Sequence, residues 1–256
     1  MDLDRLGGLV TKAVSPRPRP GNRPPRVAEF RGGMLNSVGL ANPGLDHVRS
    51  DELPWLVSRL GRAQVLVNVV GFTVEEYGEV VTGLEDVHGI AAFELNLSCP
   101  NTSAGGIEFG ADRECVRRIV SLCRGCTTLP LVAKLSPVLP DVADMAVVAR
   151  DAGADGITVV NTMPGLLFGH EGQTRLGQGS GGVSGPALLP VGVLAVARVV
   201  ERTGAFPVIG VGGVRSAADV EQYLQAGATL VGLGTGALAN PRLPERIIAD
   251  LEQGDA

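Results

Sequence analysis

The amino-acid sequence predicts an α/β domain in which repeated strand and helix units build a (β/α)8 TIM barrel that lacks its first strand and helix. Its 256 residues are 45% hydrophobic, which suits one domain with a single core over residues 1–256. Short apolar runs alternate with amphipathic segments, and the last two runs each end in a glycine-rich turn. These three observations favour parallel strands covered by helices.

Seven apolar runs have the composition of buried strands, because they are continuous rather than alternating. Helix start signals stand between them at Thr73 with Glu76 (a capping box), at Asp141 and at Ser216. Such βα repeats fit either a Rossmann-like sheet or a closed barrel. The seven predicted strands cover residues 6–14, 65–70, 91–98, 131–136, 156–162, 207–213 and 230–236.

The glycine-rich turns after the last two strands favour the barrel. They read "GVGGV" at Gly210–Val214 and "GTGAL" at Gly234–Leu238. Unobstructed backbone N–H groups cradle a phosphate, and barrels commonly carry this site after strands seven and eight. The first turn does not complete the dinucleotide pattern G-x-G-x-x-G, because Val214 and Arg215 follow it. If these are strands seven and eight, the first strand is absent and Met1 precedes the second.

Two long connections leave the ends of predicted strands. Residues 15–44 contain many prolines and arginines, and residues 163–185 are rich in glycine. Loops of this length inside a compact domain are usually functional. Both follow strands at the carboxyl-terminal face, where barrel active sites lie.

Composition excludes several other classes of protein. A net charge of -5 gives no general attraction to nucleic acid, and the basic segment Ser15–Arg26 lacks interleaved aromatic residues. No apolar run approaches the length of a membrane span, and the acidic N-terminus does not resemble a secretory signal. These features indicate a cytoplasmic protein. Cys123 and Cys126 form "CRGC" without a second pair at suitable spacing, so we expect no metal site.

Polar residues end five of the otherwise apolar strands. A polar group buried without a partner costs a few kcal/mol, so five such strand ends predict a polar pocket. Asparagine amides offer both a donor and an acceptor, which suits the edge of a pyrimidine-like ring or a flavin. Lysines suit a carboxylate or the N1/O2 edge of a flavin. The residues are Lys12, Asn68, Asn96 with Cys99, Lys134, and Asn161 with Thr162.

These motifs, taken together and in order, resemble the dihydroorotate dehydrogenase family of pyrimidine (UMP) biosynthesis. The resemblance covers essentially the whole chain and rests on "TKAVSPRPRPGNRPPR", "GMLNSVGLANPG", "ELNLSCPNT", "LVAKLSP", "VVNT", "GGVSGPAL", "GVGGV" and "GTG". It implies a barrel with FMN across its carboxyl-terminal mouth. A strand and helix with an "ASG"-like turn that begins the family's pattern has no counterpart before "MDLDRLGGLV".

The resemblance also assigns roles to individual residues. The FMN phosphate would lie on Gly212, Gly213, Gly234 and Thr235. Other flavin contacts would come from Lys12, Ala13, Asn68, Asn96, Lys134, Val160 and Gly185. The substrate, dihydroorotate, would be bound by Lys12, Asn36, Ser37, Val38, Gly39, Leu40, Asn96, Asn161 and Thr162.

Cys99 matches the family's catalytic base. It would remove the proton from C5 of dihydroorotate while hydride passes from C6 to the flavin N5, giving orotate. A cysteine at this position resembles the soluble class 1 enzymes. "MLNSVGLANPG" is most similar to the NAD-linked type, whose catalytic subunit pairs with a subunit that carries FAD and an iron–sulfur cluster. A homodimer or heterotetramer is therefore expected, with fumarate as the alternative electron acceptor.

Two other functions stay open from the sequence. A flavoenzyme similar to dihydropyrimidine dehydrogenase shares the cysteine motif, although the usual "CPH" is here Cys99, Pro100 and Asn101. A noncatalytic remnant that does not hold FMN is the other, because a barrel open at one seam exposes two strand edges and lacks one wall of the flavin site.

Overall fold

The chain is described by a computed structural model over residues 2–98 and 109–254. Its main sheet has seven parallel strands in the order β1-β4-β5-β6-β7-β10-β11. Each overlaps a strand predicted from the sequence, and the predicted α/β architecture is confirmed. The strands are β1 (Gly8–Val10), β4 (Gln64–Val69), β5 (Ile90–Asn96), β6 (Leu131–Leu135), β7 (Gly156–Val159), β10 (Val208–Val211) and β11 (Leu230–Gly232).

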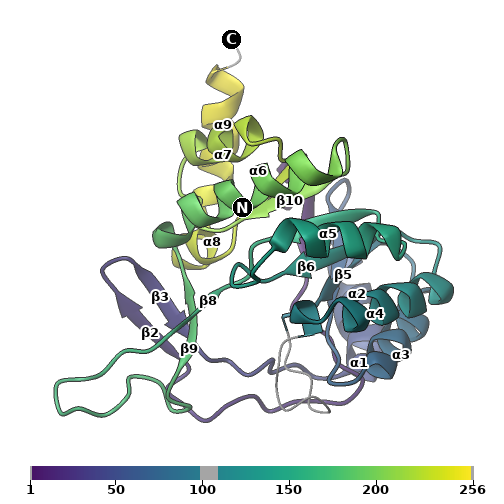
Figure 1. The fold of residues 1–256 in the computed structure, drawn as a ribbon, viewed down its shortest axis with the longest axis horizontal. Helices are drawn as coiled ribbons and strands as arrows, with labels where there is room; N and C mark the ends of the chain where they lie inside the picture. Colours follow the sequence, from purple (N-terminus) through teal and green to yellow (C-terminus); the bar gives the residue numbers. More distant parts are fainter. Residues whose placement is uncertain (1, 99–108, 255–256) are drawn as a thin grey trace.

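Helices cover the outer face of this curled sheet (Figure 1). Neighbouring helices pack on one another in chain order, α3 on α4, α4 on α5 and α5 on α6. The three predicted start signals are N-caps: Thr73, Asp141 and Ser216 each accept a hydrogen bond from a backbone N–H three residues ahead. The helices are α1 (Leu45–His47), α2 (Leu53–Val57), α3 (Val74–Leu84), α4 (Arg113–Cys126), α5 (Val142–Asp151), α6 (Leu189–Thr203), α7 (Ala217–Gln225), α8 (Thr235–Ala239) and α9 (Leu243–Gly254).

Short helical turns complete the order of elements. The turns η1 (Leu3–Arg5), η4 (Phe109–Ala111) and η5 (Pro186–Leu188) are 3-10 helices, and η2 (Val48–Glu52) is a π-helical turn between α1 and α2. In the described part of the chain, β1 and β11 are the two edges of the main sheet. The main sheet curls like part of a barrel wall (Figure 1).

A second, antiparallel sheet is built from the two long connections. Its order is β2-β3-β9-β8, from β2 (Val27–Phe30), β3 (Gly33–Asn36), β8 (Met163–Gly165) and β9 (Gly181–Ser184). Met34 pairs with Ser184, and Asn36 pairs with Gly182. The sequence indicated functional loops here but no strands. The pairing joins segments almost 150 residues apart and places them over the carboxyl-terminal ends of the main strands (Figure 1).

One hydrophobic core lies between the main sheet and its helices. Val67 and Leu95 from the strands and Val80 and Ile119 from the helices are fully buried in it. A small separate cluster under the second sheet contains Ala28, Leu35 and Leu176. The large core positions the strand ends rigidly, because close-packed interiors resist displacement.

The "CRGC" segment ends helix α4. Cys123 is buried in the core, and burial raises the pKa of its thiol to about 12. The Cys126 thiol donates to the Leu122 carbonyl oxygen. Both cysteines therefore belong to the packing of this helix.

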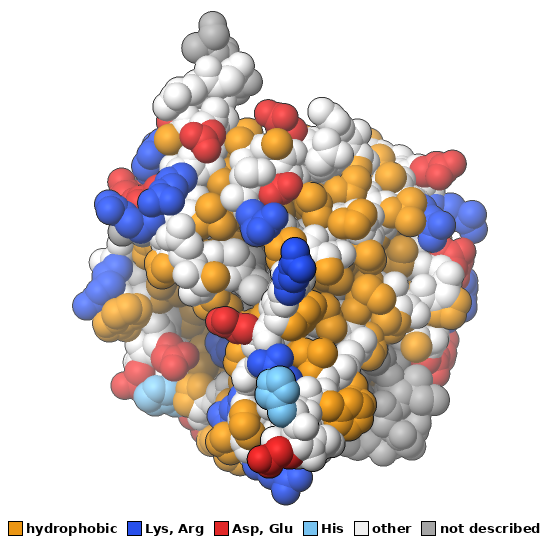
Figure 2. Space-filling model, turned by 90° about the vertical axis from the view of Figure 1, so that its left-hand side faces the viewer, with side chains coloured by type: hydrophobic (Ala, Val, Ile, Leu, Met, Phe, Trp, Pro, Cys, Tyr) orange, Lys and Arg blue, Asp and Glu red, His pale blue; other side chains and the backbone are white. Residues whose placement is uncertain are grey.

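The surface combines apolar and charged regions. Figure 2 shows a face on which apolar side chains cover much of the middle, interrupted by Lys, Arg, Asp and Glu. Large exposed apolar side chains include Phe168 and Leu238, which are 62% and 77% exposed. Every helix within residues 2–98 and 109–254 is too short or too polar to cross a bilayer.

Candidate active site

Two adjoining cavities open at the carboxyl-terminal ends of the main strands. Their volumes are about 910 and 560 Å3, within the range of ligand sites. We call them the larger and the smaller cavity. They share the lining residues Lys134, Asn161, Thr162, Val211 and Gly234, so one extended molecule can occupy both.

Every site residue that was predicted from the sequence and that the structure describes lines one of these cavities. The larger cavity is lined by Lys12, Ala13, Asn36, Ser37, Val38, Gly39, Leu40, Asn68, Asn96, Lys134, Asn161, Thr162 and Gly234. The smaller cavity is lined by Lys134, Val160, Asn161, Thr162, Gly185, Gly212, Gly213, Gly234 and Thr235. The predicted flavin and substrate positions are therefore adjacent. Cys99 lies outside the described residues, directly after Ser98, which lines the larger cavity.

Four inward-facing side chains on neighbouring strands form a hydrogen-bonded cluster, here called the polar floor: Asn68, Glu94, Lys134 and Thr158. Asn68 Nδ2 donates to Glu94 Oε1 over 2.6 Å, and Lys134 Nζ lies 3.3 Å from the same oxygen. Thr158 Oγ1 donates to Glu94 Oε2 over 2.8 Å. The carboxylate is therefore satisfied from three strands, β4, β6 and β7.

A second amide pair lies beside the polar floor. Asn161 Nδ2 donates to Asn96 Oδ1 over 3.3 Å, and Asn161 Oδ1 accepts from the backbone N–H of Thr162. The buried Tyr77 donates its hydroxyl to the Asn96 carbonyl oxygen over 2.7 Å. Since Asn96 Oδ1 is already an acceptor, its amide NH2 is the group available to a ligand in the larger cavity.

The smaller cavity is bounded by a backbone cradle that we call the glycine rim: Gly212, Gly213, Gly234 and Thr235. Gly212 and Gly213 have φ values of +130° and +80°, which residues with a side chain rarely adopt. Within the described residues, the N–H groups of Gly213, Gly234 and Thr235 donate to no acceptor. A Cβ on Gly234 would meet nothing within 4 Å, so this backbone faces open space.

Tyr223 of α7 supports the glycine rim from behind. Its hydroxyl donates to the Gly212 carbonyl oxygen over 2.7 Å, and its ring is fully buried. Gly192 and Gly210 make room for this side chain, since a Cβ on Gly192 would clash with its hydroxyl oxygen and a Cβ on Gly210 with its ring. Burial raises the pKa of Tyr223, so its phenol remains a donor at neutral pH.

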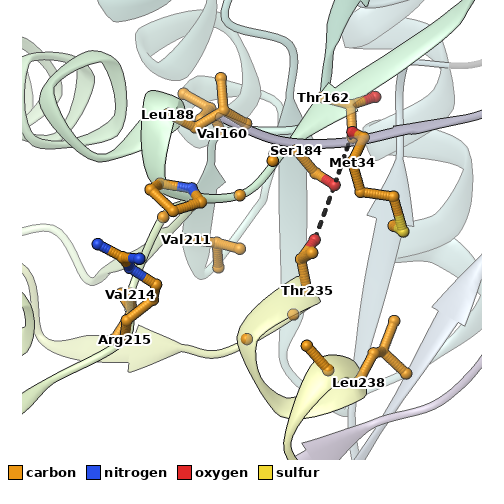
Figure 3. Close-up of a pocket in the computed structure, with 18 of the residues that line it drawn as sticks. Met34, Val160, Thr162, Ser184, Leu188, Val211, Val214, Arg215, Thr235 and Leu238 are labelled. Atoms are coloured by element: carbon orange, nitrogen blue, oxygen red, sulfur yellow. Dashed lines mark hydrogen bonds between the residues drawn. The ribbon is translucent and has the colours of Figure 1, made fainter. Parts of the chain in front are cut away.

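Thr235 also links the rim to the second sheet. Its hydroxyl donates to Ser184 Oγ over 2.7 Å, and Figure 3 shows the two side chains pointing toward one another. Gly185, at φ +104°, follows Ser184 and packs on Gly33. The second sheet therefore fixes one wall of the smaller cavity.

The loop at residues 36–40 closes the larger cavity from the side of the second sheet. Asn36 Nδ2 donates to the Gly182 carbonyl oxygen over 3.1 Å. Asn22 Nδ2 donates to Ser37 Oγ over 2.8 Å. The Arg19 guanidinium lies 4.1 Å from the centroid of the Phe72 ring and lines the same cavity. The first long connection therefore supplies both the loop and its support.

Sequence reasoning missed Glu94, Arg19, Thr158 and Tyr223. Glu94 carried a usable signal, because it is a charged residue within an apolar run and stands two positions before Asn96, on the same face of the strand. The others had no such signal. Their importance depends on contacts with residues distant in the sequence.

The chemistry of the two cavities fits a flavin mononucleotide. Free N–H groups on the glycine rim suit a phosphate, because adjacent backbone amides form anion-binding concavities. Lys134 and Asn68, on the floor, offer a cation and an amide to a polar ring edge. Fold and site together define an α/β barrel-type protein with a phosphate cradle beside a polar pocket.

Comparison with known proteins identifies the family. The family model described as dihydroorotate dehydrogenase matches residues 1–254. The chain is 41% identical over 254 residues to a protein of Trichlorobacter lovleyi named "Dihydroorotate dehydrogenase B (NAD(+)), catalytic subunit", covering 99% of this chain and 83% of the relative. A Desulforudis audaxviator protein of the same name is 43% identical, covering 99% and 82%.

A solved structure shares the fold. The crystal structure of DHODH from Eimeria tenella in complex with ferulenol aligns with a TM-score of 0.77 at 24% identity, covering 95% of this chain and 74% of that one. The family model and the relatives show that the chain belongs to the dihydroorotate dehydrogenase family, whose members are flavin-dependent. The family predicted from the sequence is confirmed.

Proposed function

We propose that this chain is the catalytic subunit of an FMN-dependent dihydroorotate dehydrogenase that oxidises dihydroorotate to orotate in pyrimidine biosynthesis. The observation that carries the proposal is the convergence of the site residues. Those described by the structure all line two adjoining cavities at the carboxyl-terminal ends of the strands. The names of the relatives support the same activity.

The glycine rim would bind the FMN phosphate, and Lys134 with Asn68 would contact the polar edge of the ring. FMN, when bound, supplies the two-electron acceptor for the hydride that leaves C6 of the substrate. Lys12 would hold the substrate carboxylate, because it lines the larger cavity and a lysine side chain donates hydrogen bonds to a carboxylate. Asn96, with its amide NH2 available, and Asn161 would orient the ring carbonyl and N–H groups.

Cys99 would act as the base that takes the proton from C5 of dihydroorotate. A free thiol has a pKa of about 8.5, close enough to neutral pH for general-base catalysis worth roughly a hundredfold or more. Replacing Cys99 by Ser should slow flavin reduction and raise its pH optimum, because a hydroxyl is a weaker base than a thiolate. Equal rates for both proteins at all pH values would contradict this role.

We propose a partner subunit that carries FAD and an iron–sulfur cluster and passes electrons to NAD. The term "catalytic subunit" and the NAD(+) in the names of the relatives support it. The broad apolar area in Figure 2 also supports a protein partner, because large exposed apolar patches usually mark interaction surfaces. A cytoplasmic homodimer or heterotetramer is the corresponding assembly, and fumarate is the alternative acceptor.

The test is the visible spectrum of the purified protein after loading with FMN under anaerobic conditions. Dihydroorotate should bleach the oxidised flavin band, whereas 5,6-dihydrouracil should leave it unchanged. Bleaching by dihydrouracil alone would instead indicate an enzyme similar to dihydropyrimidine dehydrogenase. Failure to bind FMN, or a bound flavin that stays oxidised with dihydroorotate, would contradict the proposed function.

A further inference from the structure

Glu94 is a buried carboxylate at the centre of the polar floor. Its side chain is 1% exposed, yet it lines the larger cavity. It stands on β5, between β4, which carries Asn68, and β6, which carries Lys134. A buried charge is strongly unfavourable unless it is paired and hydrogen-bonded. Glu94 meets this requirement with donors from Asn68, Lys134 and Thr158, so its position depends on the whole floor.

The carboxylate fixes which groups its neighbours can offer a ligand. A carboxylate only accepts hydrogen bonds, so the Asn68 amide must direct its NH2 toward Glu94. Asn68 Oδ1 is then the atom available as an acceptor, and no described residue donates to it. A ring N–H at this position would find an acceptor rather than a donor.

The carboxylate also fixes the charge of the floor. The Lys134 side chain is 20% exposed and lines both cavities, so its ammonium faces a ligand. Glu94 lies 3.3 Å from this ammonium and offsets its charge. A ligand that gains negative charge therefore meets a neutral pair rather than a full cation.

We propose that Glu94 is a positioning residue that sets both the hydrogen-bond polarity and the net charge of the flavin-facing floor. This inference rests on the proposed function, because it assumes that the ring of FMN lies on the floor. Glu94 orients Asn68 and Lys134 and limits how far the floor favours reduced over oxidised flavin. It acts through its neighbours and is not a catalytic residue.

The test compares the dissociation constants of oxidised and reduced FMN for three proteins: the unsubstituted chain, Glu94→Gln, and Glu94→Gln combined with Lys134→Met. Glu94→Gln has the same shape but leaves the Lys134 charge uncompensated. Because reduction places negative charge at the flavin N1/O2 edge, the preference for reduced FMN should rise on the order of tenfold. The double substitution restores a neutral floor, and the preference should return to within about threefold of the original.

Glu85→Gln at the exposed C-cap of α3 is the matched control, since it removes the same charge away from the cavities. It should leave the preference unchanged. Equal weakening of both forms of FMN in Glu94→Gln, with no change in preference, would overturn this inference and leave the proposed function intact. An unsubstituted chain that binds neither form would overturn both.

Discussion

The polar floor and the glycine rim offer a ligand two different kinds of group. The floor uses side chains from β4, β5, β6 and β7 that hold one another through Glu94. The rim uses backbone N–H groups after β10 and β11, which Tyr223 and Ser184 hold from outside. A substitution in an interlocked side-chain cluster changes the stability of the fold. A substitution in a backbone cradle that faces open space changes ligand binding alone.

This difference suits the two ends of a nucleotide. A phosphate needs several N–H groups and no particular side chain. A redox-active ring needs a controlled charge and a fixed order of donors and acceptors at its edge. The two regions should therefore separate experimentally into one that controls folding and redox preference and one that controls affinity.

The largest expected effect comes from Lys134→Met in the polar floor. The substitution leaves the buried Glu94 carboxylate without its cation, and such unpaired charges cost several kcal/mol. Because Lys134 is partly exposed, we expect the free energy of unfolding to fall by about 3 kcal/mol. Urea-induced unfolding measures this free energy. Adding Glu94→Gln should recover most of the loss, and no recovery would show that the two residues are not coupled.

The next effect comes from Gly234→Val in the glycine rim. The new side chain would project into space that is open in the structure, so the fold should keep its thermal stability. FMN affinity should fall about a hundredfold, or nearly 3 kcal/mol, because the side chain would occupy the phosphate position. Fluorescence titration with FMN measures the affinity.

Gly125→Ala is the control for this substitution, because Gly125 on α4 also has no neighbour within 4 Å of its Cβ position but lies far from the rim in the fold. It should bind FMN normally. If Gly234→Val bound FMN as tightly as the control, the rim would not hold the phosphate.

A smaller effect is expected for Tyr223→Phe, which supports the rim indirectly. The Gly212 carbonyl oxygen would lose its buried donor, at a cost of about 1–2 kcal/mol. The rim should then be less well ordered, and FMN affinity should fall roughly tenfold while the preference between oxidised and reduced FMN stays constant. A changed redox preference would show that the rim and the floor are not independent.

The parallel sheet was predictable because each strand carries its own signal. Residues 65–70 and 131–136 are mostly apolar runs, and Thr73 and Asp141 mark the helix starts that follow them. The polar pocket followed from those strands, because residues at the ends of parallel strands meet at one edge of the sheet.

The second sheet was not predictable in the same way. Strand β8 reads "MPG" and β9 reads "GGVS", which are short and contain residues that disfavour strands. They are strands because β3 lies beside β9 and supplies its hydrogen bonds. Tyr223 illustrates the same limit, since only the fold brings it to Gly212.

The smallest expected effect lies outside both regions, at Asp4 in η1. Its carboxylate accepts hydrogen bonds from the N–H groups of Gly61, Arg62 and Ala63, which lower its pKa. Because its pKa is lower in the folded state, the carboxylate stabilises the fold at pH values above its unfolded pKa, near 3.8. That stability is lost as the pH falls through the folded pKa. Asp4→Asn should lower the Tm slightly at pH 7, with the difference vanishing in acid. FMN binding should not change, and a Tm difference that persists in acid would contradict this role.

The most direct test of the account is a crystal structure of the protein with FMN. We predict the phosphate within hydrogen-bond distance of the N–H groups of Gly213, Gly234 and Thr235, and the polar edge of the ring beside Lys134 and Asn68. A phosphate bound elsewhere, or a ring that does not contact the polar floor, would contradict the division of the site into rim and floor.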